Sequence, residues 1–487
     1  MNIYSPSDDS PNEFNLGSSY DIAIIGAGPA GMSAAITAAD AGATVVVLDD
    51  KPQPGGQIYR KVTSSPLAQP EALGEDYLKG AQLVEAFQNC NAEHLHGASV
   101  WHVGDNGEVL FSRDGGTHSL TARELIISGG AMERPFPIPG WHLPGVMSAG
   151  SAQVMLKSDG LVRDNAVFVG TGPLLYLIVA QYLRLGVPVK ALIDTTPKSA
   201  YIDSMKELSG TFSAPKMVSK GLLLLNEIRK AGVPVYRFAK DLEINGESAA
   251  TGLKFTSGNE GRQIEADHIF LHQGVIPNLN LTRALGLEHA WCEQQLCWKP
   301  KLNRWGQSSV PTISVAGDGS GIVGADGAAL MGKLVALNQL QRHNRISAAE
   351  RDQQARPLFR ELEKLNKFRR FIDRLYRPID AHRIPDAPDT VVCRCEERTV
   401  ADLQRGFELG ASGPQDLKGM TRCGMGPCQG RQCGHTVSEL LAQWRGTTVD
   451  QVGYYRLRSP MRLLNLTELG QFSRVEPGKT SAAGAKS

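Results

Sequence analysis

One stretch of this sequence contains cysteines at a spacing that could bind a metal centre. Five of the eight cysteines lie between residues 393 and 433, with Cys433 in or near the next expected helix. Four thiolates on two loops suit a [2Fe–2S] cluster or a structural zinc ion. The Cys-x-Cys spacing is short for zinc, and the neighbouring glycines leave backbone N–H groups free to face sulfur. We therefore expect a [2Fe–2S] cluster held by Cys393, Cys395, Cys423 and Cys428, while Cys433 is either a spare thiol or a competitor of Cys428.

Glycines at a regular spacing mark a second such stretch. Gly26, Gly28 and Gly31 follow an apolar run, and a helical pattern of small residues begins after them. Gly26 permits a tight turn, Gly28 lets the backbone approach a pyrophosphate, and Gly31 lets helix and strand pack closely. The helix N-terminus then presents unpaired N–H groups to the phosphates. The pattern predicts dinucleotide binding by these glycines and by the intervening Pro29 and Ala30.

Two acids and a second turn extend this predicted site. The next apolar run ends in Asp49 and Asp50, where a carboxylate can accept a hydrogen bond from a ribose hydroxyl. The sequence Gly55-Gly56-Gln57 follows a few residues later. Because it lies just past the acids, we expect Gly56 and Gln57 to contact the cofactor.

A later segment is expected to return to the same site. The apolar run from Ile313 to Ala316 is followed by Gly317 and Asp318, and then by a helical pattern. An aspartate at the end of a strand can accept a hydrogen bond from a ribityl hydroxyl, and glycine allows close backbone approach. We therefore expect Gly317 and Asp318 to contact a flavin.

A second nucleotide-binding pattern begins near residue 165. Gly170 and Gly172 follow a short apolar strand, but Leu175 stands where a third glycine is usual. A side chain there should hold helix and strand apart. The following strand ends in Asp194, which would favour NADH over NADPH because it repels a 2′-phosphate. NAD(P)H binding, an adenine-nucleotide-only site and a degenerate site all remain open for this unit.

These residues require alternating strands and helices to position them. We expect strand, helix and strand over 22–25, 32–41 and 44–48, a helix over 75–90, and a meander over 97–128. The second unit repeats the strand and helix pattern. A further meander is expected over 232–271, with strands that include 264–271. Thr399 and Asp402 are spaced to cap a helix that ends near Leu409. The fold class is therefore α/β with two Rossmann-like units, plus a small helical [2Fe–2S] domain.

Length and composition limit the remaining possibilities. A chain of 487 residues is expected to form several domains, and its net charge of +1 gives no electrostatic case for nucleic acid. No apolar stretch has transmembrane length. The polar N-terminus does not resemble a signal peptide, and clustered cysteines without one indicate a reducing compartment. We expect a cytoplasmic protein, with peripheral attachment to the inner membrane as the alternative.

The expected domain organisation follows from these patterns. We predict an N-terminal part of the flavin domain, an inserted nucleotide-binding domain and a second flavin-domain part, then a helical linker, the cysteine-rich domain and an extension. The expected boundaries are a disordered tail over 1–19, the first flavin-domain part over 20–150, the inserted domain over 151–276 and the second flavin-domain part over 277–340. The linker follows over 341–388, the cysteine-rich domain over 389–450 and the extension over 451–487.

The order of these motifs over residues 20–340 resembles the two-dinucleotide-binding-domain flavoproteins, which include thioredoxin reductase and glutathione reductase. In that family the first unit binds FAD. One departure is informative, because the sequence has no redox-active cysteine pair at the positions that those reductases use. Cys292 and Cys297 lack the required strand-to-helix setting, so we interpret them as ordinary thiols. Disulfide reduction is therefore not expected.

The cysteine-rich segment resembles the bacterioferritin-associated-ferredoxin-like [2Fe–2S] domain. With GGQIYR, ERPFPIPGWHLPGV and HQGVIPN, the whole chain is similar to the α (A) subunits of opine oxidases, D-hydroxyproline dehydrogenases and hydrogen cyanide synthase. The resemblance implies an electron-transferring subunit with FAD and a [2Fe–2S] cluster. An amino-acid-oxidase-like β subunit, sometimes with a further small subunit, would oxidise a secondary amine or imino acid. Some relatives also hold an FMN at the subunit interface.

Two other functions remain open from the sequence. The alternative enzyme is a stand-alone NAD(P)H-dependent flavoprotein oxidoreductase, which would receive hydride at the second unit. A non-enzymatic redox sensor that uses the cluster as a switch is a third hypothesis. The amine substrate, and whether the acceptor is a quinone or a soluble carrier, do not follow from the sequence.

Overall fold

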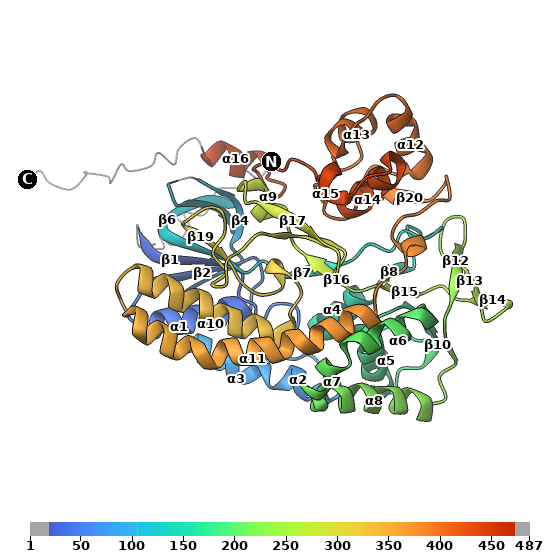
Figure 1. Ribbon diagram of the computed structural model, residues 1–487, viewed down its shortest axis with the longest axis horizontal. Helices are drawn as coiled ribbons and strands as arrows, with labels where there is room; N and C mark the ends of the chain where they lie inside the picture. Colours follow the sequence, from blue (N-terminus) through green and yellow to red (C-terminus); the bar gives the residue numbers. More distant parts are fainter. Residues whose placement is uncertain (1–18, 105, 473–487) are drawn as a thin grey trace, which may run out of the picture.

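The computed structural model describes residues 19–104 and 106–472 (Figure 1). The predicted disordered tail therefore lies almost wholly outside the described residues, as does the end of the predicted extension. The first unit is a sheet with the parallel order β3-β2-β1-β6-β19. Its strands are β1 (Tyr20–Ile25), β2 (Val45–Asp49), β3 (Glu93–His96), β6 (Gly116–Ile127) and β19 (Ile313–Val315). The meander expected over 97–128 is confirmed as β4 (Ser99–Val103), β5 (Glu108–Arg113) and β6.

Helices cover one face of this sheet. Ile22 and Ile24 of β1 are buried in one cluster with the side chains of α1 (Pro29–Asp40), α3 (Gly80–Gln88) and α10 (Gly324–Arg342). Ala23 points to the other face, toward β4 and β5. A Cβ atom on Gly332 of α10 would lie 2.0 Å from the carbonyl oxygen of Ala30, so glycine is required where α1 and α10 meet. This close packing brings the C-terminal edge of β19 next to the start of α1.

The second unit is a five-stranded parallel sheet with the order β11-β10-β9-β15-β8. Its strands are β8 (Val146–Ser148), β9 (Ala166–Gly170), β10 (Val189–Asp194), β11 (Val235–Tyr236) and β15 (Ile269–His272). The helices α4 (Ala149–Asp159), α5 (Pro173–Arg184) and α8 (Pro215–Lys230) pack around it. Two short strands, β7 (Ala131–Glu133) and β16 (Val275–Pro277), pair where the chain passes between the units.

The prediction of a single strand over 264–271 was wrong. β14 (Glu260–Glu265) belongs to a separate antiparallel sheet with β12 (Lys240–Asn245) and β13 (Gly252–Ser257), whereas β15 belongs to the parallel sheet. Because the two strands belong to different sheets, β14 ends at Glu265 and β15 begins only at Ile269.

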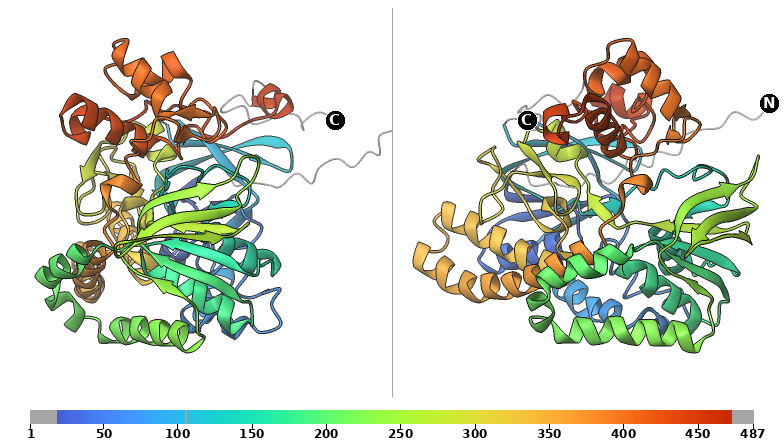
Figure 2. Two further views of the ribbon diagram at one scale, coloured as in Figure 1. Left: turned by 90° about the vertical axis from the view of Figure 1, so that its right-hand side faces the viewer. Right: turned by 45° about the vertical axis from the view of Figure 1, so that its right-hand side comes forward.

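The C-terminal part forms a helical domain at one end of the molecule (Figure 2). The long helix α11 (Ala348–Leu375) packs on α10 and leads to this domain. The domain contains β20 (Val391–Cys393), β21 (Arg398–Thr399), α12 (Val400–Glu408), α13 (Pro414–Thr421), α14 (Gly434–Arg445) and α15 (Val449–Val452). The predicted cap of α12 is confirmed, because Thr399 and Asp402 form a reciprocal capping box. Among the described residues, no helix combines the length and the apolar character needed to span a bilayer.

Candidate functional site

Three predicted cofactor loops meet at the C-terminal edge of the first sheet. The backbone N–H of Gly55 donates a hydrogen bond to the carbonyl oxygen of Ala27 at 2.8 Å. A Cβ atom on Gly56 would lie 2.9 Å from the Cα of Gly28, and one on Gly317 would lie 2.9 Å from the Cβ of Ala30. The glycine-rich turn, the Gly-Gly-Gln turn and the Gly-Asp turn are therefore side by side, as their roles in one site require.

The spacing of the first glycines has a direct steric cause. A Cβ atom on Gly31 would lie 1.9 Å from the carbonyl oxygen of Gly26, and Gly26 itself has a φ of +104°. Pro29 is the first residue of α1 and Gly28 is its N-cap. The first-turn N–H groups of α1 are thereby presented at the strand edge, which is the arrangement that binds pyrophosphate.

The two predicted ribose acceptors differ in the structure. Asp49 is buried, and its carboxylate accepts hydrogen bonds from the backbone N–H groups of Ala27 at 2.5 Å and Lys51 at 2.8 Å. Burial raises the pKa of Asp49 despite these bonds. Asp50, by contrast, has a side chain that is 56% exposed and is paired with Lys51. Asp49 therefore stabilises the turn, and Asp50 is the more accessible acid.

Asp318 is placed at the start of α10. Its Oδ1 accepts hydrogen bonds from the backbone N–H groups of Val323 at 2.8 Å and Gly324 at 2.9 Å. A carboxylate offers two oxygens, so Asp318 can cap this helix with one and accept from a ligand hydroxyl with the other.

Lys157 is a buried residue near the site that the sequence did not reveal. It lies on α4 with 2% exposure, and its Nζ donates to the carbonyl oxygens of Gln57 and Ile58 at 3.3 and 3.0 Å. Burial lowers the pKa of Lys157 to about 7. A helix of the second unit thus holds the Gly-Gly-Gln turn of the first. No local sequence pattern around Lys157 indicates that contact.

The predicted acid of the second unit is closed off by the chain itself. Asp194 is only 2% exposed. Its Oδ2 accepts a hydrogen bond from the hydroxyl of Tyr176 at 2.8 Å, and its Oδ1 accepts one from the backbone N–H of Thr196 at 2.9 Å. The hydroxyls of Thr171 and Thr196 lie 2.7 Å apart, which ties the glycine-rich turn to the end of β10. Both oxygens of this carboxylate are therefore already engaged.

Glycines of the second turn have a packing role. A Cβ atom on Gly170 would lie 1.6 Å from the carbonyl oxygen of His272, and one on Gly172 would lie 3.0 Å from its Nε2. Leu175 is fully buried in the hydrophobic cluster behind the turn. These glycines are thus required by the protein whether or not a nucleotide binds.

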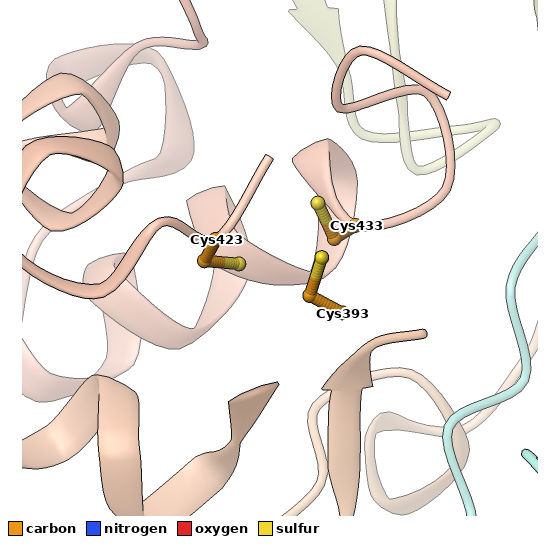
Figure 3. A group of neighbouring side chains, drawn as sticks. All are labelled: Cys393, Cys423 and Cys433. Carbon is orange, nitrogen blue, oxygen red and sulfur yellow. The ribbon is translucent and has the colours of Figure 1, made fainter. Parts of the chain in front are cut away.

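Five cysteine side chains gather in the C-terminal domain. The sulfurs of Cys393, Cys423 and Cys433 all lie within 4.8 Å of one another, and the three residues are buried (Figure 3). They come from the end of β20, the loop after α13 and the N-cap of α14. Burial raises the pKa of the Cys395 thiol, and a hydrogen bond to the side chain of Cys428 raises it further, so these two thiols are also in contact.

This geometry changes the set of candidate ligands. Of the four predicted ligands, Cys393 and Cys423 lie in the buried group, whose third member is Cys433. Cys395 and Cys428 form a separate neighbouring pair. Close approach of the loops depends on Gly426, because a Cβ atom there would lie 3.2 Å from the sulfur of Cys395. Thiolates at this density suit an iron–sulfur cluster or zinc.

Tyr455 adjoins the cysteines. The hydroxyl of Tyr455 lies 3.5 Å from the sulfur of Cys423 and 3.7 Å from that of Cys433. Its ring fills the space left by Gly424 and Gly430, where a Cβ atom would lie 2.7 Å from ring atoms. Tyr455 was not among the residues predicted from the sequence, although the two glycines that flank the cysteines indicate that a side chain packs closely there.

A hairpin connects the cysteine-rich domain with the first candidate site. It consists of β17 (His289–Cys292) and β18 (Cys297–Pro300). In the turn between these two strands, the Gln295 side chain makes hydrogen bonds at 2.9 and 3.0 Å with the backbone of Ile322, just after the Gly-Asp turn. Trp298 of β18 is buried among residues of the cysteine-rich domain. Arg283 stacks between Trp298 and Tyr454, with its guanidinium carbon 4.5 and 5.1 Å from the two ring centres.

Comparisons with known proteins agree with this architecture. A model of the pyridine nucleotide-disulphide oxidoreductase family matches residues 20–339, and a model of the sarcosine oxidase A3 domain matches residues 388–471. The fold and site therefore define a flavoprotein oxidoreductase. The A subunit of opine oxidase from Rhizobium meliloti is 39% identical over 474 residues, which cover 96% of this chain and 90% of that protein. The chain belongs to the family of these opine oxidase A subunits.

More distant relatives extend the comparison. Hydrogen cyanide synthase subunit HcnB from Pseudomonas aeruginosa is 32% identical over 452 residues, covering 90% of this chain and 96% of that protein. The crystal structure of L-proline dehydrogenase from P. horikoshii has a TM-score of 0.66 at 18% identity, covering 93% of this chain and 79% of that chain. This last likeness concerns the fold alone.

Proposed function

We propose that this chain is the electron-transferring subunit of a heteromeric dehydrogenase or oxidase for a secondary amine or imino acid. The substrate, of the opine or hydroxyproline and proline class, would be oxidised on an amino-acid-oxidase-like partner with its own FAD. This chain would pass the electrons to a quinone or a soluble carrier. The relatives named as subunits of opine oxidase and hydrogen cyanide synthase support a function within a complex.

FAD fits the first candidate site by its chemistry. The backbone of α1 offers N–H groups to the pyrophosphate, Asp50 is an accessible acceptor for a ribose hydroxyl, and Asp318 has an oxygen to accept from the ribityl chain. Close contacts at Gly28 and Gly56 keep side chains out of the space where the three turns meet. FAD bound here would supply reversible two-electron chemistry.

A [2Fe–2S] cluster fits the cysteine-rich domain. The donor set is all sulfur, and the group of Cys393, Cys423 and Cys433 is buried, as a low-dielectric redox centre requires. A bound cluster would accept electrons singly. Five thiols are available for four ligand positions, so one of them would serve as a neighbour and not as a ligand.

The observation that carries the proposal is the hairpin of β17 and β18. Gln295 binds the backbone beside the Gly-Asp turn, while Trp298 is buried in the cysteine-rich domain. The two candidate redox sites are thus both contacted by one hairpin of the same chain. Such a connection suits transfer of electrons between two centres at fixed separation.

The stand-alone NAD(P)H oxidoreductase is disfavoured by Asp194. Both its oxygens accept hydrogen bonds within the protein, and it is nearly inaccessible. A ribose hydroxyl would have to displace Tyr176 to reach this carboxylate. The second unit is therefore better suited to a structural role than to hydride delivery.

The experiment is anaerobic stopped-flow reduction of the purified chain, with and without its co-expressed partner. We expect equimolar FAD, iron with matching sulfide, and an electron paramagnetic resonance signal after reduction with dithionite. NADH should not bleach the flavin, and an amine substrate should bleach it only when the partner is present. Rapid bleaching by NADH, or the lack of an iron–sulfur signal, would contradict the proposal.

A further inference from the structure

The connection between β10 and β11 exposes an unusual number of apolar side chains. Residues 195–231 form α6 (Lys198–Ser204), the short helices over 205–207 and 209–212, and α8. More than half of the large hydrophobic residues that are exposed in the described part of the chain lie in this segment. They are Tyr201, Ile202, Met205, Leu208, Phe212, Met217, Leu222, Leu223 and Leu225. Exposed apolar side chains concentrated in one segment favour an interaction surface.

The exposure is not a consequence of loose packing. Gly210 packs on α11, because a Cβ atom there would lie 2.3 Å from the carbonyl oxygen of Lys367. Leu224 and Ile228 anchor α8 to the protein. In the run of four leucines from 222 to 225, only Leu224 is buried, while Leu222 and Leu223 are 63% and 67% exposed. The outer side of α8 therefore carries exposed leucines among its polar residues, on a helix whose inner side is already packed.

Basic residues outnumber acidic residues in this segment. It contains six basic and three acidic residues. Each acid is paired with a basic residue, as in the contacts of Glu207 with Arg370 and of Glu227 with Arg184. Lys216, Arg229 and Lys230 are exposed on α8 itself. Lys206 and Lys220 are themselves paired, with Asp203 and Asp76, so the surplus of positive charge rests on the exposed Lys198, Lys216, Arg229 and Lys230.

We propose that residues 195–231 bind the surface of an anionic lipid bilayer. Five of the six basic residues are lysines, which are depleted at protein–protein interfaces but are typical of helices that lie in the headgroup region. The leucines, Ile202 and Phe212 would enter the acyl boundary, and the lysines would contact anionic headgroups. The segment lies at the end of the molecule opposite the cysteine-rich domain, which would remain directed away from the lipid (Figures 1 and 2).

The inference does not depend on the proposed electron transfer. Lipid binding needs neither turnover nor a cofactor, so it can fail or succeed separately. If both hold, the chain would be brought to the phase in which quinones dissolve.

The test is co-sedimentation of the full chain, and of its complex with the partner, with two kinds of vesicle. One is phosphatidylcholine alone and the other is an equimolar mixture with phosphatidylglycerol. We expect binding to the anionic vesicles only, and loss of binding at high salt. The double variant Leu222→Ser/Leu223→Ser should bind at least about a hundredfold more weakly. The double variant Lys216→Glu/Lys230→Glu should bind at least about thirtyfold more weakly.

A matched control is Leu409→Ser, which removes an exposed leucine from the end of α12. It should leave binding unchanged, and thermal unfolding would verify that every variant is folded. Equal binding to both vesicles, or none, would overturn the proposal. So would variants that alter self-association or assembly with the partner while vesicle binding stays the same, because the surface would then be a protein interface.

Discussion

The hydroxyl group of Tyr455 lies 3.1 Å from the carbonyl oxygen of Cys423 and 3.5 Å from its sulfur. The ring is buried against Gly424 and Gly430, so its position is determined by packing on both sides. A hydroxyl held in this way can donate to a thiolate and stabilise negative charge on sulfur. Tyr455 would therefore position and tune a cluster bound by these thiols, as proposed above.

Replacing Tyr455 with Phe should lower the midpoint potential of the cluster by about 50 mV, because the reduced form carries more negative charge and loses more from the missing hydrogen bond. Redox titration monitored by electron paramagnetic resonance measures this shift. Tyr454→Phe is the matched control, since Tyr454 contacts the carbonyl oxygen of Gly430 at 3.5 Å. Equal potentials in the two variants would show that the contact with Cys423 has no electronic effect.

The position of Cys393 among the other thiols predicts the effect of replacing it. The sulfurs of Cys393, Cys423 and Cys433 lie within 4.8 Å of one another, and hydrogen bonds from the other two thiols lower the pKa of Cys393. Cys393→Ala should therefore lose nearly all bound iron, whereas Cys90→Ala, in another domain, should keep it. Iron and sulfide analysis of the purified variants is the measurement. Retention of the cluster in Cys393→Ala would exclude this residue as a ligand.

The close approach of two turns predicts the effect of a single methyl group. Gly56→Ala would place a Cβ atom 2.9 Å from the Cα of Gly28, at a residue with a φ of +61°. We expect the loops to separate and the affinity for FAD to fall at least about tenfold, with a destabilisation of about 1–3 kcal/mol. Flavin fluorescence during dialysis measures the loss. Gly261→Ala, where a Cβ atom meets nothing within 4 Å, should behave like the wild type.

Burial of Lys157 predicts a dependence of stability on pH. Its pKa falls from 10.5 to about 7 in the folded protein, so between these values the unfolded state binds more protons. The contribution of Lys157 to the free energy of unfolding should therefore rise by about 2–3 kcal/mol from pH 7 to pH 9. Below about pH 7 this contribution should not change.

Urea unfolding of wild type and Lys157→Met at both pH values tests this expectation. The comparison between the two proteins removes the contributions of tyrosines and cysteines that also titrate near this range. An identical pH dependence in both proteins would contradict the assignment to Lys157.

The sequence alone was sufficient to predict those features whose interacting residues are close neighbours in the chain. The spacing of Gly26 and Gly31 predicted the turn because a Cβ atom on Gly31 would clash with the carbonyl oxygen of Gly26, within one strand–turn–helix segment. The capping box of Thr399 and Asp402 was predictable for the same reason, since its two partners are one helical turn apart. The family resemblance was likewise carried by short motifs in a set order.

Only the tertiary structure decided which of the candidate residues are available. Asp49 and Asp194 both end a strand after a glycine-rich turn, yet one stabilises the turn and the other is covered by Tyr176. Contacts such as those of Tyr455 with Cys423, and of Lys157 with Gln57, join residues that are 32 and 100 positions apart. No local pattern encodes such pairs, because they form only when separate elements pack. The sequence therefore determined the kinds of chemistry present, and packing determined which side chains can take part.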